Sequence, residues 1–184
     1  MTAGIGHNGG PQPADAWARH CWAKARADLL PHLPIEVIRR RVARAQALGL
    51  DYKTYAGVRA TTGRDVVAFL YSSNALRILP KSPDLPPELA AHLARAAAQH
   101  RGLAVLPLTP LALDAATMGL LAQCHPAPRA FASFRETRAA LRAATQGLPC
   151  EGVILIAEPH EKDWAAAGKL AYALPVQALA ANLA

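Results

Sequence analysis

The chain has 184 residues, of which 52% are hydrophobic and 18% charged, which is enough for one globular domain with a small attached module. Its formal net charge of +7 suits a polyanionic partner. No apolar run approaches the ~20 residues that a transmembrane helix needs, which argues against a membrane protein, and the glycine-rich start lacks the apolar segment of a signal peptide. With three scattered cysteines, these features predict a cytoplasmic protein.

The first 13 residues are rich in glycine and proline and contain too few apolar side chains to form a core. We expect a disordered arm at 1–13. Gly4, Gly6 and Gly9 match the spacing G-x-G-x-x-G, but no strand precedes them and Pro11 follows, so a dinucleotide cannot be held there in the usual way. The sequence predicts no cofactor.

The peptide Gly4-Ile5-Gly6-His7-Asn8-Gly9-Gly10-Pro11 resembles a short N-terminal tag found on otherwise unrelated alphaproteobacterial and prophage proteins, several of which resemble DNA-binding regulators. The resemblance covers eight residues and implies neither a fold nor a catalytic residue. It implies a docking or processing signal, and therefore a protein partner bound through Gly4–Pro11.

Apolar residues at helical spacing predict three helices in the segment 14–63. The first covers 14–30, and Pro31 and Pro34 separate it from the second, which runs from Ile35 to Leu48. Gly49 ends the second helix, and Asp51 can cap a third over 52–60. We expect these helices to form a separate, basic module.

Residues 41–60 resemble a helix-turn-helix motif, in which the second helix enters the major groove of DNA. The resemblance rests on small or apolar residues around a tight turn, namely Ala45, Leu48, Gly49, Leu50, Tyr55 and Val58. Arg44 departs from it, because an apolar residue is common at that position, and Gly57 lowers the helix propensity of the predicted reading helix. The alternative is an ordinary structural αα-hairpin, which the same pattern of small and apolar residues also fits. The resemblance implies DNA contacts by Lys53, Thr54 and Arg59 on the reading helix, and phosphate contacts by Arg39, Arg40, Arg41 and Arg44.

The distribution of charge favours the same interpretation. Residues 1–64 contain ten Lys/Arg and four Asp/Glu, a net charge of +6, whereas residues 65–184 contain ten Lys/Arg and nine Asp/Glu, a net charge of +1. A basic helix face that is simply exposed to solvent would give the same distribution of net charge. An excess of positive charge around the motif nevertheless suits a nucleic-acid partner.

After Gly63 the pattern changes to short apolar runs separated by helix-like segments. Runs at 65–71, 103–108 and 152–157 predict strands buried on both faces, as in a parallel sheet, and 129–133 is a candidate fourth strand. The predicted helices cover 87–100, 111–124, 134–146 and 161–174, and Ser133 with Glu136 forms a capping-box pattern. We therefore predict an α/β fold, with a three-helix module followed by a small, mainly parallel sandwich of three or four strands over 64–184.

Polar side chains follow the predicted strands at the edge where parallel sheets bind ligands. They could line a ligand pocket made of Ser72, Ser73, Asn74, Thr109, Glu158 and His160. Polar residues at strand ends also form turns and caps, and no phosphate loop or nucleophile elbow accompanies these. The pairs His20-Cys21 and Cys124-His125 lie too far apart to indicate a metal site.

The leading hypothesis is a DNA-binding, transcriptional-regulatory or phage-related protein whose α/β part mediates homodimerisation or senses a ligand. The alternative is a non-enzymatic adaptor whose N-terminal arm docks a protein partner. A small-molecule enzyme using Glu158 and His160 with Ser72 or Ser73 is less favoured, because no catalytic motif accompanies these residues.

Overall fold

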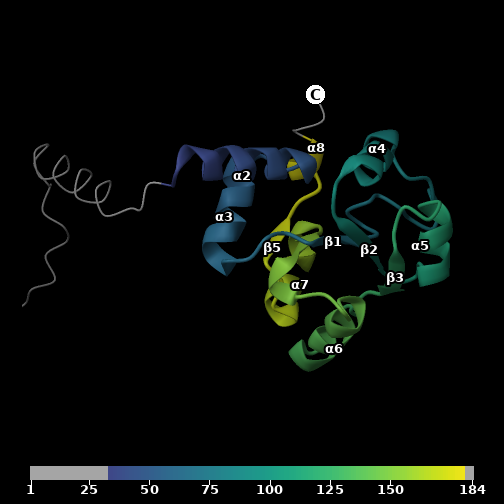
Figure 1. The fold of residues 1–184 in the computed structure, drawn as a ribbon. Helices are drawn as coiled ribbons and strands as arrows, with labels where there is room; N and C mark the ends of the chain where they lie inside the picture. Colours follow the sequence, from purple (N-terminus) through teal and green to yellow (C-terminus); the bar gives the residue numbers. More distant parts are fainter. Residues whose placement is uncertain (1–32, 181–184) are drawn as a thin grey trace, which may run out of the picture. The chain divides into compact units, whose positions relative to one another are not determined.

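The computed structural model describes residues 33–180 (Figure 1). The chain divides into one unit that ends at Ile38 and a second that begins at Arg39. The described part of the first unit is residues 33–38, and the rest of the description concerns the second unit. The predicted arm at 1–13 and the predicted helix at 14–30 lie outside the described residues.

Helices and strands alternate along most of the described chain. In order, the elements are α2 (Ile35–Ala47), α3 (Tyr52–Thr62), β1 (Ala68–Ser72), α4 (Pro87–Arg95), β2 (Gln99–Ala104), α5 (Pro110–Ala116), β3 (Gln123–Pro126), α6 (Phe134–Ala144), the 3-10 turn η1 (Cys150–Gly152), β4 (Val153–Ile156), the 3-10 turn η2 (Pro159–Glu161), α7 (Asp163–Gly168), β5 (Tyr172–Leu174) and α8 (Gln177–Ala180).

The five strands form one all-parallel sheet in the order β3-β2-β1-β4-β5. In the central pairs, Leu70 of β1 lies opposite Arg101 of β2 on one side and Leu155 of β4 on the other. The chain first builds the sheet outward from β1 to β3, and then returns to add β4 on the other side of β1. This reversal places a topological switch point between the carboxyl ends of β1 and β4.

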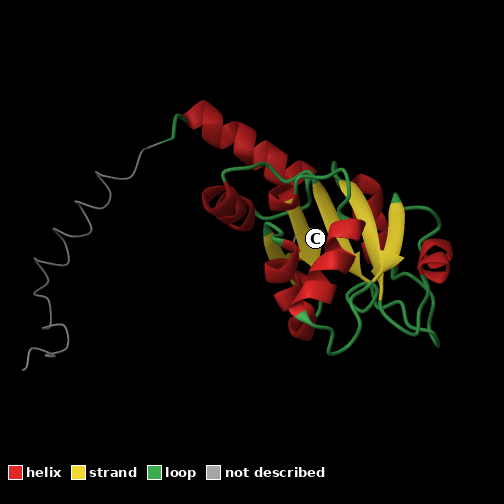
Figure 2. Cartoon of the chain, turned by 90° about the horizontal axis from the view of Figure 1, so that it is seen from below, coloured by secondary structure: helices red, strands yellow, loops and turns green. Residues whose placement is uncertain are grey.

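Helices cover both faces of the sheet (Figure 2). Alternate residues of each central strand point to opposite faces, so Phe69 and Tyr71 enter one core cluster and Ala68 and Leu70 the other. The first cluster also contains buried side chains of α2, α3, α4, α5 and α8, and the second those of α6 and α7. The predicted α/β fold is confirmed, but the sheet has five strands instead of three or four.

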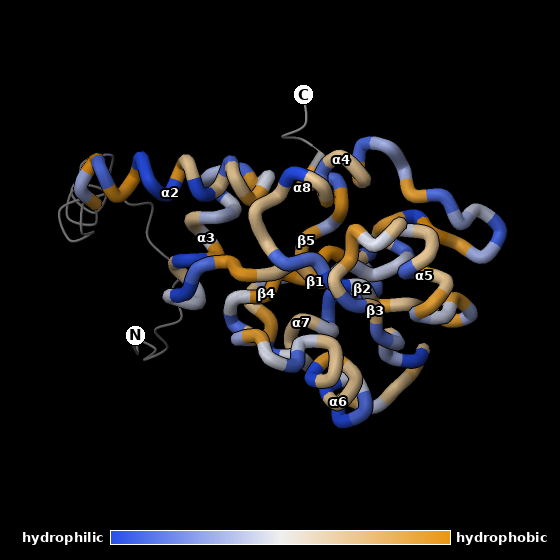
Figure 3. Tube along the Cα trace, turned by 45° about the vertical axis from the view of Figure 1, so that its right-hand side comes forward, coloured by the Kyte–Doolittle hydropathy of each residue, from blue (hydrophilic) through white to orange (hydrophobic). Residues whose placement is uncertain are grey.

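The two helices that precede the sheet share its core. Ala45 of α2 and Tyr55 and Val58 of α3 are buried in the same cluster as Phe69 of β1. Along α2, hydrophobic and hydrophilic positions alternate in the way expected of a helix with one covered face (Figure 3). The part of the predicted module that lies in the second unit therefore packs as one body with the sheet.

The second strand was predicted at the wrong place. Residues 99–104 form β2, whereas the prediction placed a helix up to His100 and a strand at 103–108. The sequence Gln-His-Arg-Gly does not read as a buried strand, yet His100 and Arg101 are buried because each finds a distant partner. Nδ1 of His100 shares a hydrogen bond with the Tyr71 hydroxyl at 3.2 Å, and Arg101 donates to carbonyls at the end of α6.

Two strands were missed and one was misplaced. β3 and β5 were predicted as the ends of helices, and the candidate strand at 129–133 is a turn and loop. Both missed strands lie at the edges of the sheet and are only three or four residues long, so their side chains lack the continuous apolar pattern of central strands. Among the described residues, no helix combines the length and apolar character needed to cross a membrane.

Candidate functional site

The turn between α2 and α3 buries the residues on which the predicted helix-turn-helix resemblance rests. The five non-glycine residues on which the resemblance rests are all buried, with exposed fractions of 3% or less: Ala45, Leu48, Leu50, Tyr55 and Val58. Gly49 has φ +68°, a left-handed conformation that glycine adopts without strain, and Leu50 donates its backbone N–H to the Ala45 carbonyl. The sequence pattern thus corresponds to the inward side of a real helical hairpin.

The turn is fixed from both sides. Asp51 caps α3 by accepting a hydrogen bond from the Thr54 N–H at 2.9 Å, and hydrogen bonding to the side chain of Thr54, followed by that to its backbone, lowers the pKa of the Asp51 carboxyl. His92 of α4 packs on the other side, so closely that a Cβ on Gly49 would lie 2.5 Å from its Cε1 atom. Only a residue without a side chain fits at this position.

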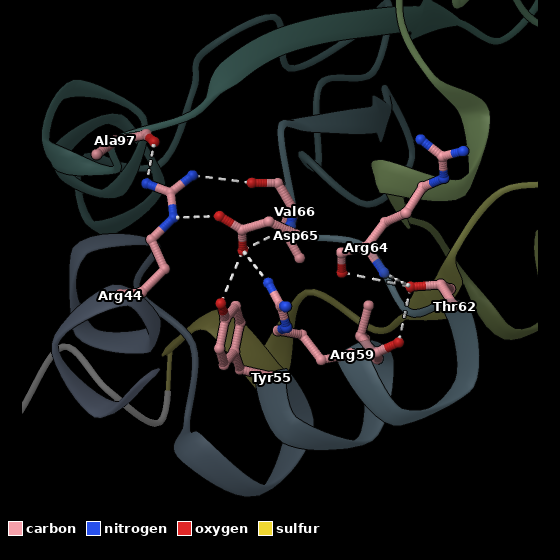
Figure 4. Close-up of polar contacts among 9 residues, drawn as sticks. Arg44, Tyr55, Arg59, Thr62, Arg64, Asp65, Val66 and Ala97 are labelled. Carbon is pink, nitrogen blue, oxygen red and sulfur yellow. Dashed lines mark hydrogen bonds and ion pairs between the residues drawn. The ribbon is translucent and has the colours of Figure 1, made fainter. Parts of the chain in front are cut away.

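Asp65, in the segment that leads from α3 into β1, joins the hairpin to the sheet (Figure 4). One carboxylate oxygen accepts from Nε of Arg44 at 3.1 Å, and the other accepts from the Tyr55 hydroxyl at 2.7 Å. Arg59 lies 3.8 Å from the same carboxylate. Arg44 also donates to the backbone carbonyls of Val66 and Ala97, at 2.9 and 3.1 Å.

The electrostatics of Asp65 follow from these contacts. Partial burial alone would raise its pKa, but the hydrogen bond from Tyr55 and the charge of Arg44 outweigh burial, and the pKa is lowered. The pKa of Tyr55 is raised by burial and by its bond to Asp65. Arg44, the position at which the motif departs from the usual apolar residue, therefore has an internal role, and Arg59 shares it.

The outward face of α3 carries small residues and one cation. Lys53, Gly57 and Ala60 are exposed, whereas Thr54 is half-buried. Nothing lies within 4 Å of the position that a Cβ on Gly57 would take. On α2, Arg40 is exposed, and so is its neighbour Arg39, while Arg41 is half-buried.

A groove of about 520 Å³ runs along one side of α3. Residues of α3 that include Lys53, Thr54, Gly57 and Thr61 line it from the helix, and Tyr172 and Leu174 of β5 line it from the edge of the sheet. Two of the predicted DNA-contacting residues, Lys53 and Thr54, thus border open space beside α3.

The residues of the predicted ligand pocket are brought only partly together. Ser72 ends β1, Ser73 and Asn74 follow it, and Glu158 follows β4, so they meet at the switch point. There, the amide of Asn74 donates to Oε1 of Glu161 at 2.8 Å, and the backbone N–H of Glu158 donates to the other oxygen of Glu161 at 2.9 Å.

Glu161 is the residue that sequence reasoning missed. It is only 1% exposed, and its carboxylate ties the end of β4 to the end of β1. The signal was the spacing of Glu158 and Glu161, a capping box that begins η2. Both serine hydroxyls accept backbone N–H groups, that of Ser72 from Asn74 and that of Ser73 from Val105.

Thr109 does not join this cluster, and His160 only borders it, with its Nε2 atom 3.8 Å from Oε1 of Glu161. The Thr109 hydroxyl caps α5 by accepting from the Ala112 N–H. His160 is exposed and lines a separate pocket of about 570 Å³ with residues such as Arg129, Phe131 and Trp164. The strand-end residues thus act largely as caps and turn contacts. Within residues 33–180, no group of three or more His, Cys, Asp or Glu side chains is placed to hold a metal ion.

Comparison with known proteins gives no family to which the chain can be assigned: no family model, no curated protein and no solved structure matches it.

Proposed function

We propose that this protein binds duplex DNA through α3, as a transcriptional-regulatory or phage-related protein. The observation that carries the proposal is the separation of the two sides of the hairpin. Its five interior positions are buried in the core that covers the sheet, while Lys53, Gly57 and Ala60 of α3 remain exposed, Lys53 and Gly57 beside the open groove between α3 and β5. A reading helix needs this arrangement, because it must be anchored on one side and accessible on the other.

The exposed face of α3 has suitable chemistry for a groove. Gly57 and Ala60 are small enough for the helix backbone to come close to base edges, and an alanine methyl can contact the thymine methyl group. Lys53 can donate to guanine O6 and N7 or to a phosphate. Arg40, Arg41 and Arg39 lie one helix earlier, where phosphate contacts would fix the orientation of α3.

Arg44 and Arg59 have a different part in this proposal. Both are directed to Asp65, so they hold the hairpin on the sheet instead of contacting DNA. The sheet then serves as a rigid support for α3, and dimerisation or ligand sensing by the α/β part stays a prediction.

A fluorescence-anisotropy titration with a labelled duplex of arbitrary sequence tests the proposal. We expect binding at low ionic strength that weakens steeply as salt is added, because cations on the protein displace counterions from the phosphates. Lys53→Gln should weaken binding and reduce the salt slope by about one. The matched control is Lys81→Gln, an exposed lysine in the loop after β1. Absence of salt-dependent binding by the wild-type protein would refute the proposal.

The adaptor hypothesis places its contact in residues 1–13, outside the described residues, and stays a prediction. Removal of residues 1–13 separates the two hypotheses. If α3 binds DNA, the shortened protein keeps duplex affinity, because the arm is not part of the proposed interface.

A further inference from the structure

A basic pocket lies at the amino-terminal edge of the sheet, opposite to the strand ends where ligands were predicted. It has a volume of about 260 Å³, and four cationic side chains line it: Arg64, Arg138, Arg142 and Lys169. Glu151 is the one acidic residue in its described lining. Three separate parts of the chain supply these cations, namely the segment after α3, the second half of α6 and the end of α7.

Most of the positive charge in this pocket is not neutralised. Arg64 pairs with Glu151 at 2.8 Å, and both side chains are about three-fifths exposed, at 59% and 61%. Within the part of the chain that the structure describes, Arg138, Arg142 and Lys169 make no side-chain hydrogen bond or ion pair. The lining residues therefore have a net charge of +3.

The fold brings these cations together against their mutual repulsion. Arg138 and Arg142 are four residues apart on α6 and so lie on the same side of the helix, where like charges destabilise it. Gly168 lets the end of α7 approach α6, because a Cβ there would lie 3.1 Å from Cδ1 of Leu141. Lys169 follows in a left-handed conformation, with φ +55°. A stabilising role does not explain this cluster.

We propose that the pocket binds a phosphate of the DNA backbone, which adds a second contact to the DNA reader proposed above and rests on that proposal. Arg64 links the two surfaces, since it comes two residues after α3 ends and lines the pocket. Figure 4 shows its side chain directed away from the Asp65 network.

The composition and size of the pocket favour this ligand. Arginine presents a planar fork of N–H donors that matches the oxygens of a phosphate, and three arginines and one lysine surround the same space. The volume of about 260 Å³ is below the range of about 300–1,000 Å³ that is typical of pockets for drug-sized ligands. An open, shallow basic site of this size suits one charged group of a large polyanion.

The test compares the salt dependence of duplex binding between two double variants of equal charge. Arg138→Gln with Arg142→Gln removes cations from the pocket, and Lys81→Gln with Lys162→Gln removes two exposed lysines from loops at the opposite edge of the sheet. Thermal melts establish that both variants are folded. We expect the pocket variant to bind duplex more weakly, and its slope of log K against log salt to be about two less negative than that of the wild-type protein. The control variant should keep the wild-type slope.

The possible failures can be told apart. A wild-type slope in the pocket variant would overturn the pocket and leave the proposal for α3 standing. Equal losses in both variants would also overturn it, because charge alone would then determine binding. Failure of the wild-type protein to bind duplex would overturn both proposals.

Discussion

The arginines of the hairpin and the arginines of α6 differ in whether their charge is paired within the protein. Arg44 and Arg59 lie in the segment with the large positive charge, yet both are directed to Asp65, and Arg44 makes two further bonds to backbone carbonyls. Arg138 and Arg142 lie in the segment whose net charge is only +1, yet among the described residues they have no anionic partner.

The contrast shows that a charge count along the chain does not locate an electrostatic surface. Asp65 is one residue beyond the boundary at 64, so its negative charge was added to the net charge of residues 65–184, although its side chain pairs with Arg44 and Arg59 of the preceding segment. The near-balanced total after residue 64 in turn hides a local excess of positive charge, because the carboxylates of acidic residues such as Glu136 and Glu161 are bound in caps at the other edge of the sheet. Charge that can attract a partner is the charge left over after internal pairing.

The largest difference between the two regions should appear in stability. Arg44→Met takes one donor from the Asp65 carboxylate, which keeps the Tyr55 hydroxyl, and removes the Arg44 donor from the carbonyls of Val66 and Ala97, so we expect the free energy of unfolding to fall by about 1–3 kcal/mol. Arg138→Met removes a side chain that has no such contacts and should change it by less than about 0.5 kcal/mol. Urea unfolding of both variants measures the difference, and similar losses would contradict the division into internal and free cations.

The hairpin should also respond to acid through His92, which packs on Gly49. Burial, followed by the charges of His100 and Arg95, lowers the pKa of His92 to about 4. The unfolded chain takes up this proton near pH 6.5. The contribution of neutral His92 is therefore complete above pH 6.5 and is lost as the pH falls toward 4.

His92→Phe keeps a ring against Gly49 and removes the proton site. We expect its urea midpoint to fall less between pH 7.5 and 4.5 than that of the wild-type protein, whereas His160→Gln, at an exposed position, should behave like the wild type. An unchanged fall in His92→Phe would show that another group controls the acid response.

A substitution at Gly57 should change stability and DNA binding in opposite directions. Because a Cβ there meets nothing within 4 Å, Gly57→Ala should stabilise the protein by about 1 kcal/mol through its helix propensity. The added methyl group should weaken duplex binding if α3 approaches base edges closely. Thermal melts and anisotropy measure the two effects, and a stabilised variant with unchanged affinity would argue against close approach at Gly57.

The smallest effect on stability should come from Glu151. Its pair with Arg64 is well exposed, so Glu151→Gln should change the free energy of unfolding by less than about 0.5 kcal/mol. Duplex affinity should rise, since Arg64 is released and a negative charge leaves the pocket. Weaker binding by this variant would mean that Glu151 orients Arg64 instead of competing with DNA.

Local signals in the sequence predicted local structure well. The Asp51 cap, the turn at Gly49 and the capping box of Ser133 with Glu136 are confirmed, because each depends on residues close in sequence. The α/β class is confirmed for a related reason, since central strands such as β4 are continuous apolar runs.

What could not be predicted depends on distant partners. Arg101 is buried in β2 only because carbonyls more than forty residues away, at the end of α6, accept its hydrogen bonds. The link between Asn74 and Glu161 and the convergence of Arg64, Arg138 and Lys169 likewise require the completed fold. No spacing along the chain contains this information.

The most direct test of the central claim is a titration of the ¹⁵N-labelled protein with a short duplex, followed by amide chemical shifts. If α3 and the basic pocket bind the duplex, we expect shifts along the exposed face of α3, at Lys53, Gly57 and Ala60, and around the pocket at Arg64 and Lys169, with little change at Asp65. Shifts confined to the opposite edge of the sheet, around Phe131 and His160, would contradict it, as would an unchanged spectrum at low salt.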